Sequence, residues 1–201
     1  MMETIEEKLK KGRCETLEFL PSISDIEEAA KILVSFTNNR GGSLLIGVNT
    51  KGKVVGVFPD SEISFLEKVN DFIEGEIIFN YHVHQIKHHF VIEVFIPESA
   101  LPLKFKSDFQ NAYCYRINTN SVMANKILTT FLNLKKFSKI IEFNELHSIV
   151  LDVLNAKITL SMLYKSIDLK PKKIDQILSE LIYLDKVVIV IVDKTIFYSK
   201  K

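Results

Sequence analysis

Residues 33–58 read LVSFTNNRGGSLLIGVNTKGKVVGVF, and this stretch decides how the rest of the chain is interpreted. An apolar helix end runs into a polar turn that contains Gly41 and Gly42. Two apolar runs follow, at 44–48 and 54–58, separated by a second turn that contains a glycine. Short apolar runs between glycine turns are typical of buried strands. The stretch therefore predicts a helix, a glycine turn, a buried strand and a hairpin to a second strand.

The glycine turn has two possible roles. Gly41 and Gly42 could only shape the backbone, because glycine adopts conformations that other residues avoid. Alternatively, their N–H groups and the neighbouring Arg40 could form a small anion-binding concavity. Two phosphate-binding motifs are absent from the sequence, GxxxxGK[ST] and a GxGxxG after a strand. We therefore expect no nucleotide cofactor, and no other cofactor is indicated.

Length and charge set broad limits. The chain has 201 residues and a net charge of +1, with 47% hydrophobic and 25% charged residues, which is typical of a globular protein with one or two domains. The charge is uneven: residues 1–134 carry 14 basic and 17 acidic side chains, and residues 135–201 carry 12 basic and 8 acidic ones. A basic C-terminal third is what a nucleic-acid-binding segment would have.

The cysteines and the hydropathy of the chain indicate the cellular compartment of the protein. Cys14 and Cys114 are the two cysteines, and they form neither a CxxC motif nor a disulfide framework. The N-terminal residues lack the apolar core of a signal peptide, and no run is apolar enough to cross a membrane. These features indicate a cytoplasmic protein without a membrane partner.

Periodicity and turn residues predict the elements of the first part of the chain. Ser24 is the expected N-cap of the second helix, and residues 98–111 are expected to form a loop. The predicted helices cover about 3–11, 25–38, 60–73 and 122–134, and the predicted strands cover 15–20, 44–48, 54–58, 77–86, 89–96 and 112–117.

The pattern changes after Lys135-Lys136, which predicts a domain of residues 1–134 and a second domain of residues 135–201. The second part contains three helix patterns followed by two short β-rich runs, which is the element order of a winged helix. The predicted helices cover 142–155, 159–167 and 171–184, and the predicted hairpin strands cover 187–192 and 195–199.

Two groups of side chains could bind a metal ion. Glu15 and Glu18 are carboxylates near a strand start, but their spacing places them on opposite faces of a strand. Four histidines surround one predicted hairpin, of which the two at 82 and 84 share a face and could form a two-histidine site. Solvated or structural roles are the favoured interpretation of both groups, and we expect no metal.

A second candidate site lies at residues 115–121. Arg116 is followed by Asn118 and Thr119, just before the helix predicted from about residue 122. A cation and several donors at a helix N-terminus would suit a phosphate or carboxylate. The same polar residues could also serve only as helix caps.

The third C-terminal helix carries the candidate nucleic-acid-binding residues. Lys170, Lys172 and Lys173 surround its start, and Gln176 follows one turn later. In a helix-turn-helix the N-terminal residues of this helix meet phosphates and base edges. Lys194, at the tip of the predicted hairpin, could reach an adjacent groove. The alternative is a solvated lysine face on a domain that binds a protein.

Several separated motifs together resemble the Schlafen AlbA-like domain, also called the divergent AAA domain. They are ETLEF at 15–19, SFTNNRGGSLLIGVNTKGKVVGV at 35–57, IPES at 96–99, and Tyr115-Arg116 with Asn118. The family pattern is GExxxxEFK followed by AFANTxGGxLxIGVxDxGxIxG. The resemblance covers about residues 12–128, and the C-terminal third resembles the winged helix that often follows this domain in bacterial proteins.

The resemblance implies an α/β (α+β) fold with a mixed sheet, followed by a small winged helix-turn-helix domain. It also implies nucleic-acid binding, because such proteins are described as DNA-binding or ATP-binding transcriptional regulators. Some relatives cut RNA with carboxylates from GExxxxEFK and from the turn after IGV. Here Arg13 stands at the first of these positions, Glu18 keeps the second, and uncharged Asn49-Thr50 occupies the third.

We therefore expect a DNA-binding transcriptional regulator without catalytic activity, in which Glu18 is the remnant of a catalytic cluster. Double-stranded DNA is the expected partner and a homodimer the expected assembly. A divergent metal-dependent ribonuclease or nucleotide-binding protein is one alternative. A protein-interaction module is the other.

Overall fold

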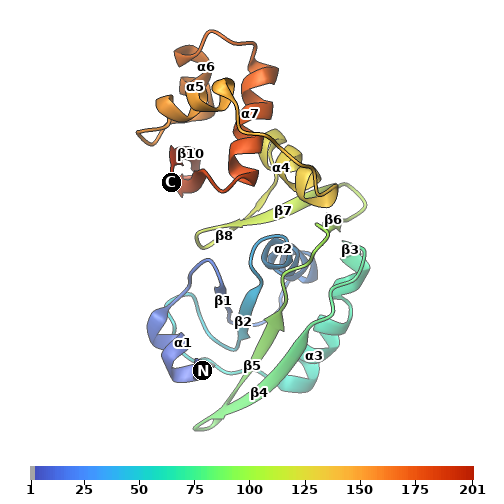
Figure 1. The fold of residues 1–201 in the computed structure, drawn as a ribbon. Coiled ribbons are helices and arrows are strands. Elements are labelled where there is room, and N and C mark those ends of the chain that lie inside the picture. Colours follow the sequence, from blue (N-terminus) through green and yellow to red (C-terminus); the bar gives the residue numbers. More distant parts are fainter. Residues whose placement is uncertain (1–2) are drawn as a thin grey trace. The chain divides into compact units, whose positions relative to one another are not determined.

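The structure is a computed structural model that describes residues 3–201 and divides into two compact units (Figure 1). The N-terminal unit comprises the described residues up to Ser99 together with Leu103–Met123, and the C-terminal unit comprises Ala100–Pro102 and Ala124–Lys201. The first two residues of the predicted N-terminal domain lie outside the described part of the chain.

The N-terminal unit combines helices with strands in mixed order. Its helices are α1 (Ile5–Lys11), α2 (Ile26–Thr37), α3 (Pro59–Glu67) and the short 3-10 helix η1 (Val69–Phe72). Its strands are β1 (Leu17–Leu20), β2 (Gly42–Ile46), β3 (Ile73–Glu74), β4 (Asn80–Ile86), β5 (His89–Ile96), β6 (Lys104–Lys106), β7 (Asn111–Ile117) and β8 (Asn120–Met123).

These strands form two four-stranded sheets, ordered β1-β2-β5-β4 and β3-β6-β7-β8. In the first sheet β1 and β2 are parallel, whereas β2 with β5 and β5 with β4 are antiparallel, so the predicted mixed sheet is confirmed. Helix α2 contacts strands of both sheets. Its fully buried Ala29, Leu33 and Phe36 share one apolar core with Leu44 and Phe105.

The start of α2 differs by one residue from the prediction. Asp25, not Ser24, caps the helix, and its side chain accepts a hydrogen bond from the N–H of Glu28. Both residues are good N-caps, and the sequence does not distinguish them.

Three further predictions fail in the middle of this unit. Residues 54–58 form no strand but one isolated bridge between Val48 and Val54, because both edges of β2 are already taken by β1 and β5. The helix predicted over 60–73 ends at Glu67. The loop predicted over 98–111 contains strand β6.

The polar cluster after β7 is a hairpin turn rather than a helix start. Asn118 adopts the left-handed conformation (φ 53°), and the chain returns as β8, where Ser121 pairs with Arg116 in the ladder. The next helix, α4 (Lys126–Lys136), is capped by Asn125. The helix N-terminus predicted beside Asn118 and Thr119 is therefore wrong.

The elements of the C-terminal unit follow in the predicted order. After α4 come α5 (Glu145–Val153), α6 (Leu160–Ser166) and α7 (Pro171–Tyr183), then the antiparallel strands β9 (Val187–Val192) and β10 (Thr195–Lys200). Helix α4 contacts α7, which explains why this unit begins at Ala124 rather than at the predicted residue 135. Within residues 3–201, no helix is long and apolar enough to span a membrane.

Candidate functional site

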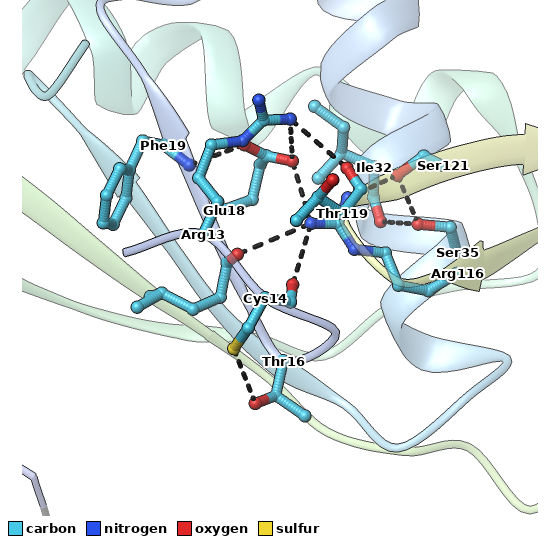
Figure 2. A network of polar contacts seen from close by, with 11 residues as sticks. Arg13, Cys14, Thr16, Glu18, Phe19, Ile32, Ser35, Arg116, Thr119 and Ser121 are labelled. Atoms are coloured by element: carbon cyan, nitrogen blue, oxygen red, sulfur yellow. Dashed lines mark hydrogen bonds and ion pairs between the residues drawn. The ribbon is translucent and has the colours of Figure 1, made fainter. Parts of the chain in front are cut away.

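Glu18, the one carboxylate that remains at the positions that the resemblance associates with RNA cleavage, lies between two arginines (Figure 2). It projects from β1 and is 3% exposed. Nε of Arg13 donates to its Oε1, Nη2 of Arg13 donates to its Oε2 at 2.9 Å, and Nη2 of Arg116 lies 2.9 Å from the same Oε2. The N–H of Phe19 also donates to Oε1 at 2.8 Å. Both carboxylate oxygens therefore have cationic partners within the protein.

Arg116, from β7, is the more deeply buried of the two arginines, with 1% exposure. Its Nη1 donates to Oγ of Ser121 at 3.1 Å and its Nη2 to the carbonyl of Cys14 at 3.1 Å, as Figure 2 shows. Its Cζ lies 4.7 Å from the centre of the Phe36 ring, a cation–π distance. Burial lowers the pKa of the guanidinium, and the charge of Glu18 opposes this shift. Arg116 is thus a structural cation held by Glu18.

Arg13 is less buried, with 32% of its side chain exposed. Besides Glu18 it binds the carbonyl of Thr119 at 3.2 Å. The sequence places Arg13 far from Arg116 and Thr119, and the structure brings it to them. An anion pocket formed by Arg116, Asn118 and Thr119 stays a prediction, but Glu18 already occupies the guanidinium that it would use.

The two asparagines before the glycines fasten the end of α2 to the second sheet. Nδ2 of Asn38 donates to the carbonyls of Leu103 and Cys114, each at 2.8 Å, and Nδ2 of Asn39 donates to that of Arg116 at 3.0 Å. Buried amides of this kind satisfy backbone groups that would otherwise lose hydrogen bonds. Sequence reasoning missed this role, although two polar residues directly after an apolar helix face are a signal for it.

Gly41 and Gly42 have the backbone-shaping role. A Cβ on Gly41 would lie 2.5 Å from the carbonyl oxygen of Ile96, and one on Gly42 would lie 2.5 Å from that of Thr16. The N–H of Gly41 already donates to the carbonyl of Phe36 at 2.9 Å, so it is not available to an anion. Arg40 points to solvent, with 65% of its side chain exposed, and lies 3.7 Å from Glu15.

The turn after β2 supplies no ligand for a cation. Oδ1 of Asn49 accepts the N–H groups of Lys51 and Lys53, at 3.0 and 3.1 Å. A divalent cation in a nuclease needs several carboxylate oxygens, and here Glu18 is neutralised and Asn49 is uncharged. The residues at the three carboxylate positions that the resemblance implies, Arg13, Glu18 and Asn49-Thr50, therefore do not fit a divalent cation.

A second buried ionic network was not foreseen. Lys8 of α1 pairs with Glu93 of β5, which also lies 2.9 Å from Nε2 of His84. Lys8 further donates to Oγ of Ser43 at 3.1 Å. The sequence does contain one sign of this network: Glu93 is the one carboxylate in the apolar run of β5, and a buried carboxylate needs a cationic partner. Among residues 3–201, no group of three His, Cys, Asp or Glu side chains could hold a metal ion, and the other hairpin histidines bring no such group together.

The lysines at the start of α7 are exposed in the C-terminal unit. Lys170, Lys172 and Lys173 point to solvent, whereas Ile174 and Ile177 are buried on the other face. Pro171 occupies the first turn, as predicted. Gln176 is exposed, and its amide donates to Oε1 of Glu180 at 2.8 Å. Lys194 is exposed at the β9–β10 turn with a left-handed backbone (φ 65°).

Polar contacts hold α7 against its neighbours. Asp175 accepts one hydrogen bond from the hydroxyl of Tyr164 of α6, and its Oδ2 lies 2.8 Å from Nζ of Lys126 of α4. The hydrogen bond with Asp175 raises the pKa of Lys126 to about 12. On α5, Nε2 of the buried His147 lies 3.0 Å from Glu180. Contacts with three helices therefore hold α7, and the lysines at its start are exposed.

The Schlafen AlbA_2 family profile matches residues 3–125, which is most of the chain and nearly the whole N-terminal unit. This chain belongs to the Schlafen AlbA_2 family. The resemblance over residues 12–128 is thereby confirmed, while the family assignment does not extend to the C-terminal unit. No curated protein matches the Schlafen AlbA_2 chain significantly.

Two solved structures are similar to this chain. The crystal structure of the DIP2311 protein from Corynebacterium diphtheriae matches with a TM-score of 0.50 and 11% identity, over 96% of this chain and 37% of that one. This likeness concerns the fold alone, and the chain spans little more than a third of that protein. The solution structure of the N-terminal domain of an ATP-dependent DNA helicase RecG-related protein from Nitrosomonas europaea matches with a TM-score of 0.43 and 20% identity, over 57% of this chain and 88% of that one.

Proposed function

We propose that this protein is a cytoplasmic, non-catalytic transcriptional regulator that binds double-stranded DNA through α7. The observation that carries the proposal is the exposure of Lys170, Lys172 and Lys173 at the start of a helix whose opposite face is buried. Lysines in this position neutralise phosphates, and the counterions they release favour binding. Membership in the Schlafen AlbA_2 family supports a nucleic-acid-related role.

The surroundings of α7 support a winged helix-turn-helix. Helices α5, α6 and α7 precede the β9–β10 hairpin, and Tyr198 of β10 forms a two-residue bridge with Ile158 before α6. In this arrangement α7 would enter the major groove and Lys194 would contact the flanking backbone. Gln176 would read a base edge after exchanging its hydrogen bond with Glu180 for one with the base.

In this proposal the N-terminal unit is a scaffold without nuclease activity. The pairing of Glu18 with Arg13 and Arg116 supports this, because a cation beside the carboxylate opposes a divalent ion. The unit would hold two copies of the chain together, since a helix-turn-helix protein usually binds two half-sites as a dimer.

Fluorescence anisotropy of a labelled random duplex at two salt concentrations tests the proposal. We expect affinity to fall steeply as salt rises. The double substitution Lys172→Glu and Lys173→Glu should weaken binding and lower the slope of log affinity against log salt by about one to two. The charge-matched control is Lys139→Glu with Lys157→Glu, because both lysines are exposed in the same unit but lie outside α7.

Equal loss of affinity in both double variants would show that only net charge matters and would remove α7 from the interface. No duplex binding at low salt would overturn the proposal. Cleavage of single-stranded RNA with Mn²⁺ that is lost in Glu18→Ala would establish the ribonuclease instead.

A further inference from the structure

The C-terminal unit contains a cavity of about 640 Å³ that DNA binding through α7 would not use. Its apolar wall is formed by Ile141, Phe143, Leu151 and Leu184. Cavities that hold small organic molecules measure roughly 300–1,000 Å³, so this one is large enough for such a ligand.

The segment leading into this cavity exposes more apolar surface than a loop requires. Phe143 is 48% exposed, and before it Phe137 and Ile140 are 74% and 91% exposed. The ring of Phe143 stacks on that of the buried His147, with 5.3 Å between the centroids, and this contact orients the ring. An apolar ligand that covered this side chain would gain free energy from removing it from water.

The rim of the cavity is basic. It carries Lys186, Lys200 and Lys201, with Asp185 as its one acidic side chain. These four side chains have a net charge of +2. Asp185 pairs with Lys201, and neither Lys186 nor Lys200 forms an ion pair within residues 3–201. The ammonium groups of these two lysines lie beside an apolar wall and can therefore pair with an anionic group of a ligand.

The backbone that carries these lysines is held in place. The N–H of Lys200 donates to the carbonyl of Leu154 at 2.7 Å, and the N–H of Lys201 donates to that of Lys186 at 3.0 Å. The N–H of Lys186 in turn donates to the carbonyl of Leu181 of α7 at 2.9 Å. A rim fixed in this way loses less entropy on binding than a mobile loop would.

We propose that this cavity binds a small amphiphilic anion, with an apolar body against Phe143 and Leu184 and one anionic group facing Lys186 and Lys200. A neutral apolar molecule would leave the lysines unused. A cation would meet a rim of the same sign. The site is independent of the proposed DNA contact.

Isothermal titration calorimetry with submicellar decanoate tests the proposal, with decyltrimethylammonium as the probe of opposite charge and the same chain length. Decanoate should bind at least about ten-fold more tightly than the cation. Lys186→Glu with Lys200→Glu changes the net charge of the rim side chains from +2 to −2 and should weaken decanoate binding roughly ten-fold or more. Phe143→Ser, at a half-exposed position, should also weaken binding. Lys157→Glu, outside the cavity, should leave binding unchanged.

Circular dichroism melting curves separate loss of the site from loss of the fold in each variant. No decanoate binding to the native chain would overturn the proposal. Equal binding of both probes, or decanoate binding that the lysine substitutions do not change, would also overturn it, because either result reduces the cavity to an unselective apolar surface.

Discussion

Glu18 and Arg116 show what a buried charge requires of its neighbours. Arg116 is almost completely buried and receives its compensating charge from Glu18. Removal of one partner from a buried ion pair leaves the other uncompensated, which is strongly destabilising. The family position that could have served catalysis therefore has a structural function in this chain.

Glu18→Gln should lower the free energy of unfolding by about 3–5 kcal/mol, because it keeps the shape of the side chain but leaves Arg116 with a neutral partner. Glu15→Gln is the control, since Glu15 is half-exposed and lies 3.7 Å from the exposed Arg40. We expect it to cost less than about 1 kcal/mol. Urea unfolding of the N-terminal unit measures both values, and similar losses in the two variants would contradict the structural role of Glu18.

We expect the buried thiol of Cys114 to lower the free energy of unfolding at alkaline pH. Burial raises the pKa of its thiol to about 12 in the folded chain, above the ordinary value of 9.0. The unfolded chain therefore releases this proton first, and stability falls as pH rises through 9 toward 12. At pH 10.5 the loss from this thiol should be about 2 kcal/mol. Cys114→Ala should lack this component, so its stability relative to the native chain should improve between pH 8 and pH 10.5. A constant difference would refute the prediction.

At the scale of elements, the turn between α2 and β2 depends on Gly41. Its φ is 67°, and a Cβ there would lie 2.5 Å from the carbonyl oxygen of Ile96 and 2.8 Å from the N–H nitrogen of Glu98. Backbone atoms cannot move aside as a flexible side chain can, so both strain and overlap would oppose any other residue.

Gly41→Ala should therefore destabilise the chain by about 2–4 kcal/mol. Gly12→Ala provides the comparison, because Gly12 has a similar φ of 76° but no atom within 4 Å of the added Cβ. Its ψ is 179°, a backbone region populated almost only by glycine, so the substitution should cost this strain, about 1–3 kcal/mol, without the added cost of overlap. Thermal melting of both variants compares the two costs. If Gly12→Ala proved as destabilising as Gly41→Ala, the close approach to Ile96 would not be the cause.

The sequence predicted those elements whose own residues mark them. It did not predict elements whose conformation depends on pairing with a strand elsewhere in the fold. Pro171 and the apolar spacing of α7 mark that helix directly. Asn118 and Thr119 have the residue types of a helix cap, but the same types suit a turn, and only pairing of β7 with β8 decides between them. Residues 54–58 form no strand for a similar reason, because β1 and β5 already pair with both edges of β2.

The candidate sites also differ in how far the sequence could predict them. The exposure of the α7 lysines follows from the helical spacing of the apolar residues around them, so neighbouring residues alone could predict it. The contact of Glu18 with Arg116 joins residues far apart in sequence, and so does the Lys8–Glu93 pair. Only the arrangement of whole elements brings such partners together, so the sequence alone could not show that Glu18 is neutralised.

For the molecule as a whole, the two compact units predict where the chain can be divided. The C-terminal unit begins at Ala124 and includes α4, whose Ile127, Leu128 and Leu132 are fully buried. Oγ of Ser179 of α7 also donates to the carbonyl of Ile127 at 3.1 Å. Helix α4 is thus part of the core against which α7 packs, although the change in sequence pattern comes only after it.

A fragment of residues 124–201 should therefore fold and unfold cooperatively, whereas a fragment of residues 135–201 should lack part of its core. Loss of the buried side chains of α4 costs roughly 2 kcal/mol each, which is comparable to the whole stability of so small a unit. Circular dichroism melting curves and the dispersion of amide proton signals compare the two fragments. If the duplex contact belongs to α7, the longer fragment should keep salt-dependent binding and the shorter one should lose it. Equal stability of the two fragments would instead place the boundary after Leu134 and show that α4 is dispensable for the C-terminal unit.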